Sequence, residues 1–226
     1  MNTSALFMPL LSHILTLDRE LTIAINGWYS PFWDSFFTLV SDTIVWIPFF
    51  VILIFCQYRS WGWRKTLFFL LLVALAVLLA DQSCNIFKYT VCRLRPSHEP
   101  SLAGMVHTVN GYLGGDFGFC SSHAANAAAV AILTSLFIRR WLCSLMFSIW
   151  VILVCWSRIY LGVHYLGDIL FGLLLGAFFS VTLYLIWRKT KWGRVSFYFP
   201  FQHTIVLSVS LFLSIVVLMS IALLTA

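Results

Sequence analysis

Long apolar runs, separated by short polar segments, dominate the pattern of residues along this chain. Six runs are long enough to cross a bilayer, for which a helix needs about 20 residues. They cover residues 36–57, 66–88, 122–138, 141–160, 164–187 and 204–225. Because lipid offers no partners to free backbone N–H and C=O groups, runs of this length are expected to be helices. The pattern therefore predicts an all-α, polytopic membrane helix bundle with about six transmembrane helices.

The segment ahead of the first run, residues 14–33, mixes charged and apolar positions. Asp18, Arg19 and Glu20 stand among leucines, isoleucines and two tryptophans. This mixture is typical of an amphipathic helix that lies in the membrane interface rather than across it. The chain shows no internal repeat, so we expect residues 1–226 to form a single membrane-embedded domain.

The composition agrees with a membrane protein. Hydrophobic residues make up 61% of the 226 residues and charged residues only 10%, whereas a soluble domain is about 25% charged. Mean hydropathy is +0.94. The net charge of +6 comes from basic residues in short loops between the apolar runs. Because these residues form no basic face on a soluble domain, we expect no nucleic-acid partner.

The six cysteines show neither a CxxC pair nor metal-ligand spacing. Most lie in apolar runs, where cysteine behaves as a small hydrophobic residue. Cys92 and Cys120 fall near one face of the predicted bundle. We expect two free thiols there, with a disulfide between them as the alternative if that face is oxidising.

Lysine and arginine are distributed unevenly between the two sides of the predicted bundle. Cytoplasmic loops carry an excess of these residues. The loops after the first, third and fifth runs carry nine, against five on the other side: Arg59, Arg64, Lys65, Arg139, Arg140, Arg188, Lys189, Lys191 and Arg194. This predicts a multi-pass protein whose more basic side faces the cytoplasm and whose less basic side faces outward, which is the periplasm if the membrane is a bacterial inner membrane.

Ionisable residues at membrane depth are costly and therefore indicate function. Here they gather on the less basic side in three blocks, residues 88–96, 120–123 and 157–168. In the first block Lys88 and Arg95 are seven residues apart, close to two helical turns. They are predicted to point the same way until Pro96 ends the helix. Two cations at one depth suit a dianionic group.

The second block opens the third apolar run with Ser121, Ser122 and His123. Either serine can cap a helix N-terminus, where free N–H groups bind anions. The histidine can then protonate a leaving oxygen.

The third block pairs His164 with Asp168 at i, i+4, which predicts that both lie on one helix face. A carboxylate there can hold the imidazole tautomer and leave Nε2 free to attack. Arg158, six residues earlier, has the planar guanidinium that suits phosphate oxygens. Any one of these basic residues alone would more simply be a membrane-interface anchor. The three blocks together predict a phosphate-handling active site.

These residues resemble the three motifs of the type-2 phosphatidic acid phosphatase superfamily. Lys88, Arg95 and Pro96 fit K-x6-R-P, residues 121–123 resemble P-S-G-H, and residues 157–168 fit S-R-x5-H-x3-D. The resemblance covers residues 35–190 and leaves the last apolar run, 204–225, as an extra span.

The resemblance implies a role for each motif residue. His164 is implied as the nucleophile that forms a phosphohistidine, Asp168 as its orienter, and His123 as general acid and later base. Neither a cofactor nor a metal is implied. A phosphate cradle is implied for Lys88, Arg95, Ser121, Ser122 and Arg158. Two positions depart from the family: Cys120 replaces Pro, and Ser122 replaces Gly and adds a hydroxyl where backbone binds phosphate.

For several further residues, the sequence allows both a functional and a structural interpretation. Asp81 and Asn85 share a helix face with Lys88, and they can either orient it or form hydrogen bonds between helices. Gly172 and Gly176 form a GxxxG pair, for which a close helix contact within the fold is the simplest reading. Polar residues of the long outer loop are expected to be ordinary solvated residues rather than headgroup selectors: His98, Glu99, His107, Asn110 and Asp116.

The leading functional prediction is a metal-independent phosphatase that acts on a lipid phosphate entering from the bilayer. Bacterial members of the family that the chain resembles act on lipid A phosphates, undecaprenyl diphosphate or phosphatidylglycerol phosphate. The glycine-rich outer loop suits a bulky headgroup, which places lipid A first. A lipid transporter is the alternative from a different class, and a haloperoxidase is disfavoured because soluble halide needs no membrane site. The oligomeric state is left open.

Overall fold

Eight α-helices account for the apolar runs in the computed structural model, which describes residues 3–191 and 195–226. Short 3-10 turns cover Ile44–Trp46, Pro96–His98 and Pro100–Leu102. The helices are α1 (Thr3–Asn26), α2 (Pro31–Ser41), α3 (Ile47–Trp61), α4 (Trp63–Val91), α5 (Ser122–Ile138), α6 (Trp141–Tyr160), α7 (Leu166–Lys189) and α8 (Phe201–Thr225).

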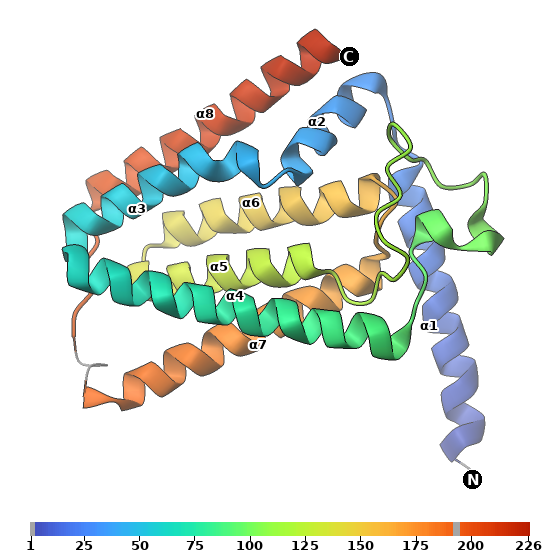
Figure 1. Ribbon diagram of the computed structural model, residues 1–226, viewed down its shortest axis with the longest axis horizontal. Coiled ribbons are helices and arrows are strands. Elements are labelled where there is room, and N and C mark those ends of the chain that lie inside the picture. Colours follow the sequence, from blue (N-terminus) through green and yellow to red (C-terminus); the bar gives the residue numbers. More distant parts are fainter. Residues whose placement is uncertain (1–2, 192–194) are drawn as a thin grey trace.

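The helices from α3 to α8 run alongside one another, whereas α1 lies across their ends (Figure 1). The turns that follow α3, α5 and α7 lie at one end of the bundle, and the long α4–α5 loop lies at the other end with α1. Among the described residues, five helical segments are long and apolar enough to cross a membrane: Ile44–Trp61, Trp63–Val91, Trp141–Tyr160, Leu166–Lys189 and Phe201–Thr225. Together with the shorter α5, they confirm an all-helical membrane bundle.

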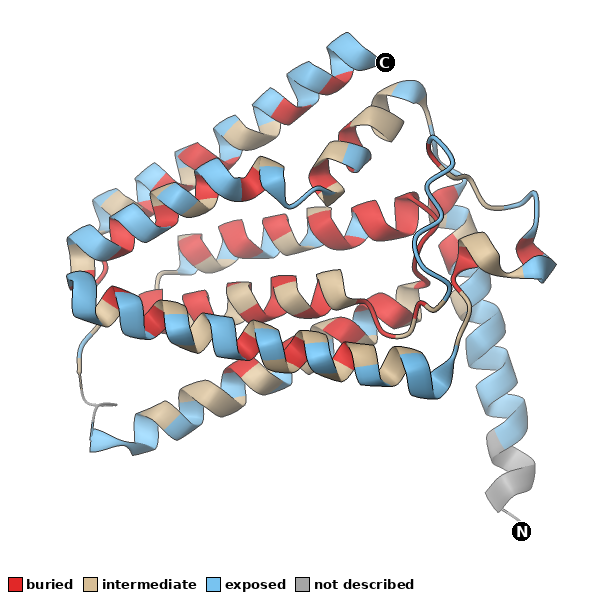
Figure 2. Ribbon diagram, viewed as in Figure 1, coloured by how far each residue is buried: buried red, intermediate tan, exposed pale blue. Residues whose placement is uncertain are grey.

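The shortest of these helices, α5, lies at the centre of the bundle. It has 17 residues and packs against α4, α6 and α7. Its buried positions are mostly alanines, whereas the outer faces of the surrounding helices are exposed and apolar (Figure 2). A helix enclosed by protein need not match the full thickness of the lipid. Alanine keeps its surface small enough for three neighbours to approach closely.

Two glycines allow α7 to lie directly on α5, which confirms the close helix contact predicted for GxxxG. A Cβ atom on Gly172 would lie 2.5 Å from the carbonyl oxygen of Ser121, and one on Gly176 would overlap the carbonyl oxygen of Ala125. Further along, Ser180 Oγ donates to Ala129 O at 3.0 Å. Small residues at a helix crossing let the two backbones approach, and this crossing places the start of α5 beside the start of α7.

The N-terminal region differs from the prediction in two ways. Instead of one helix over residues 14–33, α1 ends at Asn26 and α2 begins at Pro31, with Ser30 as its N-cap. The predicted span 36–57 is also divided, because α2 ends at Ser41 and Asp42 accepts a hydrogen bond from the N–H of Ile44. Proline at the first turn of a helix starts a new segment, and the apolar periodicity carried no sign of these breaks.

The close α5–α7 crossing predicts that Gly176→Ala destabilises the protein. The added methyl group must displace the backbone of α5, and overpacking of this kind costs about 1–3 kcal/mol. We expect the melting temperature in detergent to fall by about 3 °C or more. Gly115→Ala is the matched control, because a Cβ there meets no atom within 4 Å. Equal melting temperatures for the two variants would contradict the crossing.

Candidate active site

Two loops meet at the end of the bundle where α1 lies (Figure 1). One joins α4 to α5 and the other joins α6 to α7. Within the first loop, Leu94 pairs with Phe117 in an isolated bridge, and the N–H of Gly118 donates to Arg93 O at 2.9 Å. The two loops are joined where the N–H of Ser97 donates to Gly162 O at 3.0 Å. These backbone contacts bring the first and third motif blocks together.

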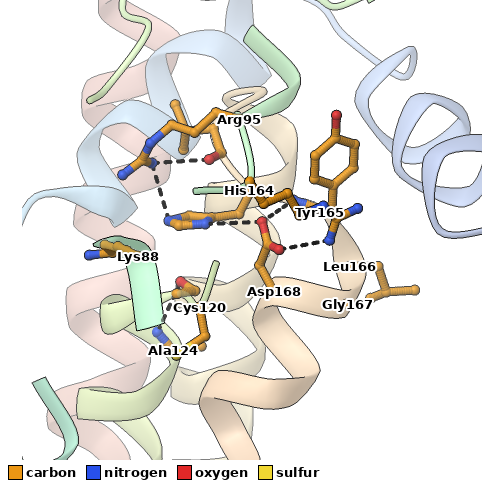
Figure 3. A network of polar contacts seen from close by, with 12 residues as sticks. Lys88, Arg95, Cys120, Ala124, His164, Tyr165, Leu166, Gly167 and Asp168 are labelled. Carbon is orange, nitrogen blue, oxygen red and sulfur yellow. Dashed lines mark hydrogen bonds and ion pairs between the residues drawn. The ribbon is translucent and has the colours of Figure 1, made fainter. Parts of the chain in front are cut away.

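His164 and Asp168 lie side by side, although not on one helix face as predicted. α7 begins at Leu166, so His164 precedes the helix and Asp168 is its third residue. The Asp168 Oδ2 atom accepts the N–H of Tyr165 at 3.0 Å in a capping box, and His164 Nδ1 lies 3.5 Å from the same oxygen. Figure 3 shows the imidazole between this carboxylate and Arg95. Both side chains are buried.

Arg95 reaches the site from a loop, which corrects the predicted two-turn helix from Lys88. α4 ends at Val91, and Cys92 adopts a left-handed conformation with φ 51°. The Nη1 atom of Arg95 donates to Val163 O at 3.0 Å and to His164 Nε2 at 3.2 Å. Gly114, with φ +71°, lies against the guanidinium, since a Cβ there would be 3.1 Å from Nη1. Glycine is therefore required at this close approach.

The surroundings of His164 favour its neutral form. Burial first, and then the positive charges of Arg95 and Arg158, lower the pKa of His164 well below its ordinary range. Since Arg95 donates to Nε2, the neutral ring must hold its proton on Nδ1, which faces Asp168. The Nε2 lone pair is then directed toward the cations.

Ser121 and Ser122 make different kinds of hydrogen bond at the start of α5. Ser121 is the N-cap, as predicted: its Oγ accepts the N–H of Ala124 at 3.4 Å, and its own N–H donates to Asp168 O at 3.1 Å. The hydroxyl of Ser122, which departs from the family motif, accepts a hydrogen bond from Lys88 Nζ at 2.8 Å. This departure therefore holds Lys88 beside α5.

Arg158 and His123 line a cavity of about 280 Å³ next to the loops. Arg158 Nη2 donates to the hydroxyl of Tyr112 at 3.2 Å, and Nη1 donates to Ser41 Oγ. Burial would raise the pKa of Tyr112, but the charge and hydrogen bond of Arg158, with the charge of Arg95, lower it overall. Asn110 also lines this cavity.

A second cavity, of about 400 Å³, extends from His123 and Ser122 between α2–α3 and α4–α6. Its other walls are mostly apolar: Val40, Trp46, Phe50, Val77, Ala127, Val130, Trp150 and Val154. The site thus combines a cationic pocket with an apolar extension.

The residues for which the sequence allowed both a structural and a functional role mainly make structural contacts. Asp81 accepts hydrogen bonds from Asn85 at 3.2 Å and from Asn126 of α5 at 3.3 Å, which is the interhelical alternative. In the outer loop, His107 stacks on Tyr29 and its Nε2 lies 2.8 Å from Asp34 Oδ1.

The remaining residues of the outer loop also make local contacts. His98 Nε2 lies 3.4 Å from Gly114 O, and Glu99 lies 4.0 Å from Arg19. Asp116 accepts the N–H of Arg95 through its backbone oxygen.

Cys92 and Cys120 are free thiols, as the sequence predicts. Cys92 is exposed and its Sγ donates to Tyr89 O at 3.2 Å, whereas Cys120 is buried with its Sγ 2.6 Å from that of Cys84. The structure records all six as free cysteines. The sequence did not single out Cys84, because it lies inside an apolar run.

Sequence reasoning missed four polar residues around the site. Ser41 and Tyr112 contact Arg158, while Arg93 and Asp18 form ion pairs beside Asp168. Arg93 lies inside the first motif as an unassigned cation, which was the one available signal. The others come from segments distant in sequence, and only the fold brings them to the motifs. Within the described residues no group of three His, Cys, Asp or Glu side chains could hold a metal ion.

Comparison with known proteins shows the family to which the chain belongs. The PAP2 superfamily profile matches residues 65–192. Over 176 residues, the chain is 39% identical to a lipid A 4'-phosphatase of Bacteroides thetaiotaomicron, covering 76% of this chain and 78% of that protein. Over 187 residues, it is 35% identical to a lipid A 4'-phosphatase of Porphyromonas gingivalis, covering 80% and 78%.

A solved structure shares the fold. The PAP2-type phosphatidylglycerolphosphate phosphatase from Bacillus subtilis superposes with a TM-score of 0.61 at 23% identity, covering 80% of this chain and 90% of that one. At this identity the likeness concerns the fold alone. The profile match, which covers more than half of the chain, and the two relatives above 30% identity establish that this protein belongs to the PAP2 superfamily.

Proposed function

We propose that this membrane protein is a phosphatase that removes a phosphate from lipid A through a phosphohistidine intermediate on His164. Membership of the PAP2 superfamily and the bundle of apolar helices support a membrane lipid phosphatase. One observation carries the mechanism. The imidazole of His164 is buried between an arginine that donates to Nε2 and a carboxylate beside Nδ1, so its unprotonated Nε2 faces the cations that would hold phosphate.

In the proposed reaction, His164 Nε2 attacks phosphorus and the bond from phosphorus to the lipid oxygen breaks. His123 donates a proton to the departing oxygen, and Asp168 stabilises the imidazolium through Nδ1–H. Water then attacks the phosphohistidine as His123 accepts its proton. The phosphorus–nitrogen bond breaks, and inorganic phosphate leaves.

The phosphate is proposed to bind among Lys88, Arg95 and Arg158, with Ser121 and the Ser122 backbone at the α5 N-terminus. Charge develops on the equatorial oxygens during phosphoryl transfer, and fixed cations in a water-poor site stabilise it. On approach of phosphate, Arg95 can exchange its bond to Nε2 for one to an oxygen. These side chains need no metal to supply positive charge.

Lipid A is favoured over the alternative substrates because the two relatives above 30% identity are named lipid A 4'-phosphatases. The apolar cavity beside His123 can take part of an acyl chain or the lipid-facing side of a sugar. Undecaprenyl diphosphate and phosphatidylglycerol phosphate remain the alternative substrates. A transporter would need the cations but neither the His164–Asp168 pair nor a second histidine.

The substrate proposal is tested by phosphate release from purified protein in detergent. We expect lipid A to be hydrolysed with the highest kcat/KM in a panel with undecaprenyl diphosphate and phosphatidylglycerol phosphate. The same rate is expected with excess EDTA, because Lys88, Arg95 and Arg158 already supply the charge. A preference for another member of the panel would replace lipid A. Loss of activity with EDTA, restored by a divalent metal, would overturn the metal-free mechanism.

The mechanism predicts that His164→Ala lowers kcat by at least about 10³-fold while the protein stays folded, because the covalent nucleophile is lost. Turnover is measured by phosphate release, and folding by melting temperature and gel filtration. His13→Ala, at an exposed position of α1, is the matched control and should retain wild-type activity. Activity of His164→Ala within about tenfold of wild type would remove His164 from this role.

We further propose that the active site faces the periplasm. Eight of the nine basic residues of the predicted cytoplasmic loops lie in the described part of the chain, and they flank the turns that follow α3, α5 and α7, at the end of the bundle opposite the site. The ninth, Arg194, lies outside the described residues. In a variant without native cysteines, Ser101→Cys should react with a membrane-impermeant maleimide in spheroplasts. Lys191→Cys should react only after lysis. The reverse labelling pattern would place the site in the cytoplasm and exclude outer-leaflet lipid as substrate.

A further inference from the structure

We propose that Arg93 and Asp18 act as a positioning pair for Asp168, which makes helix α1 a part of the catalytic apparatus. This inference rests on the proposed function, because it assigns a purpose to residues that act through Asp168. In this proposal, Arg93 and Asp18 do not bind phosphate themselves. They hold the carboxylate that orients His164.

The carboxylate of Asp168 is fully buried, so it requires a compensating charge. Its Oδ2 atom accepts a hydrogen bond from the N–H of Tyr165 and faces His164 Nδ1. Its Oδ1 atom accepts Nη1 of Arg93 at 2.9 Å. Arg93 therefore neutralises the carboxylate from one side and leaves the other oxygen for the imidazole.

Arg93 is itself held in place by α1. Its Nη2 atom donates to Asp18 Oδ2 at 2.7 Å, and its guanidinium lies 3.8 Å from the ring centroid of Tyr165. The two terminal nitrogens of the planar Arg93 guanidinium thus bind the carboxylates of Asp168 and Asp18 in fixed directions. Only 19% of the Arg93 side chain is exposed, which limits screening by solvent.

The same face of α1 caps the N-terminus of α7. Asp18 Oδ1 accepts the N–H of Gly167 at 2.7 Å, and Thr22 Oγ1 accepts the N–H of Leu166 at 3.0 Å. These are two of the N–H groups that a helix leaves unsatisfied at its start. Gly167 allows the approach, since a Cβ there would lie 2.9 Å from Asp18 Oδ2. α1 thus fixes the turn of α7 that carries Asp168.

The superfamily match begins at residue 65, so Asp18 and α1 lie outside it. The three charges alternate in sign, with Arg93 between two carboxylates. Without Arg93, a buried carboxylate would be left unpaired and would rotate or take up a proton. In either case His164 loses the acceptor that holds its tautomer. The chemical step should slow while phosphate binding is maintained.

The test is a double-mutant cycle between Arg93 and Asp168 in the full-length protein, with inorganic phosphate release from lipid A as the readout. We expect Arg93→Met to lower kcat by about 10²-fold with KM within about twofold, and Arg93→Lys to recover part of the loss. In the Asp168→Asn background, Arg93→Met should add less than about threefold, because the carboxylate on which it acts is absent. Arg19→Met is the matched control: the Arg19 side chain is exposed and lies 4.0 Å from Glu99, and its loss should leave activity unchanged.

Multiplicative losses from Arg93→Met and Asp168→Asn would overturn the inference, as would a raised KM at constant kcat. If Arg93→Met fails to fold, the cycle is run with the near-isosteric Asp18→Asn, for which we expect about a tenfold loss of kcat that vanishes in the Asp168→Asn background. A loss of kcat from Asp18→Asn that is as large in the Asp168→Asn background as in the wild type would likewise refute the inference. Failure of the proposed function is recognised separately, because His164→Ala would then remain active.

Discussion

The direct contact between α5 and α7 is the constraint on which the rest of the site depends. Gly172 and Gly176 bring the two backbones together, and the N–H of Ser121 donates to the carbonyl oxygen of Asp168 at their shared end. This crossing sets the start of α5 beside the start of α7. The second motif therefore meets the third before any substrate binds, and a larger side chain at either glycine would separate them.

Much of this arrangement could be predicted from the sequence, but for reasons that were only partly right. The apolar runs predicted the helical bundle, and the motif residues were identified because ionisable groups at membrane depth are expensive. Helical spacing was the wrong explanation for their convergence. Arg95 and His164 both lie in loops, where backbone contacts to Asp116 and the capping of α7 position them. Periodicity carries no information about such contacts.

Residues that lie far from the motifs were beyond the reach of sequence reasoning. Asp18 and Ser41 reach the site from helices outside the superfamily match, and Tyr112 reaches it from the outer loop. The predicted interfacial helix proved to be two helices, and the first of them caps α7. A buried site in a membrane bundle needs such added polar partners, because lipid can satisfy neither its charges nor its free N–H groups.

The central claim is that His164 carries the phosphate during turnover. The most direct test is to quench the enzyme in alkali during hydrolysis of lipid A labelled with ³²P at the scissile phosphate. Phosphohistidine survives alkali and is lost in acid. The account predicts acid-labile label on the peptide that contains His164 in the wild type, and none in His164→Ala. Label on a peptide without His164, or label retained in the alanine variant, would contradict it.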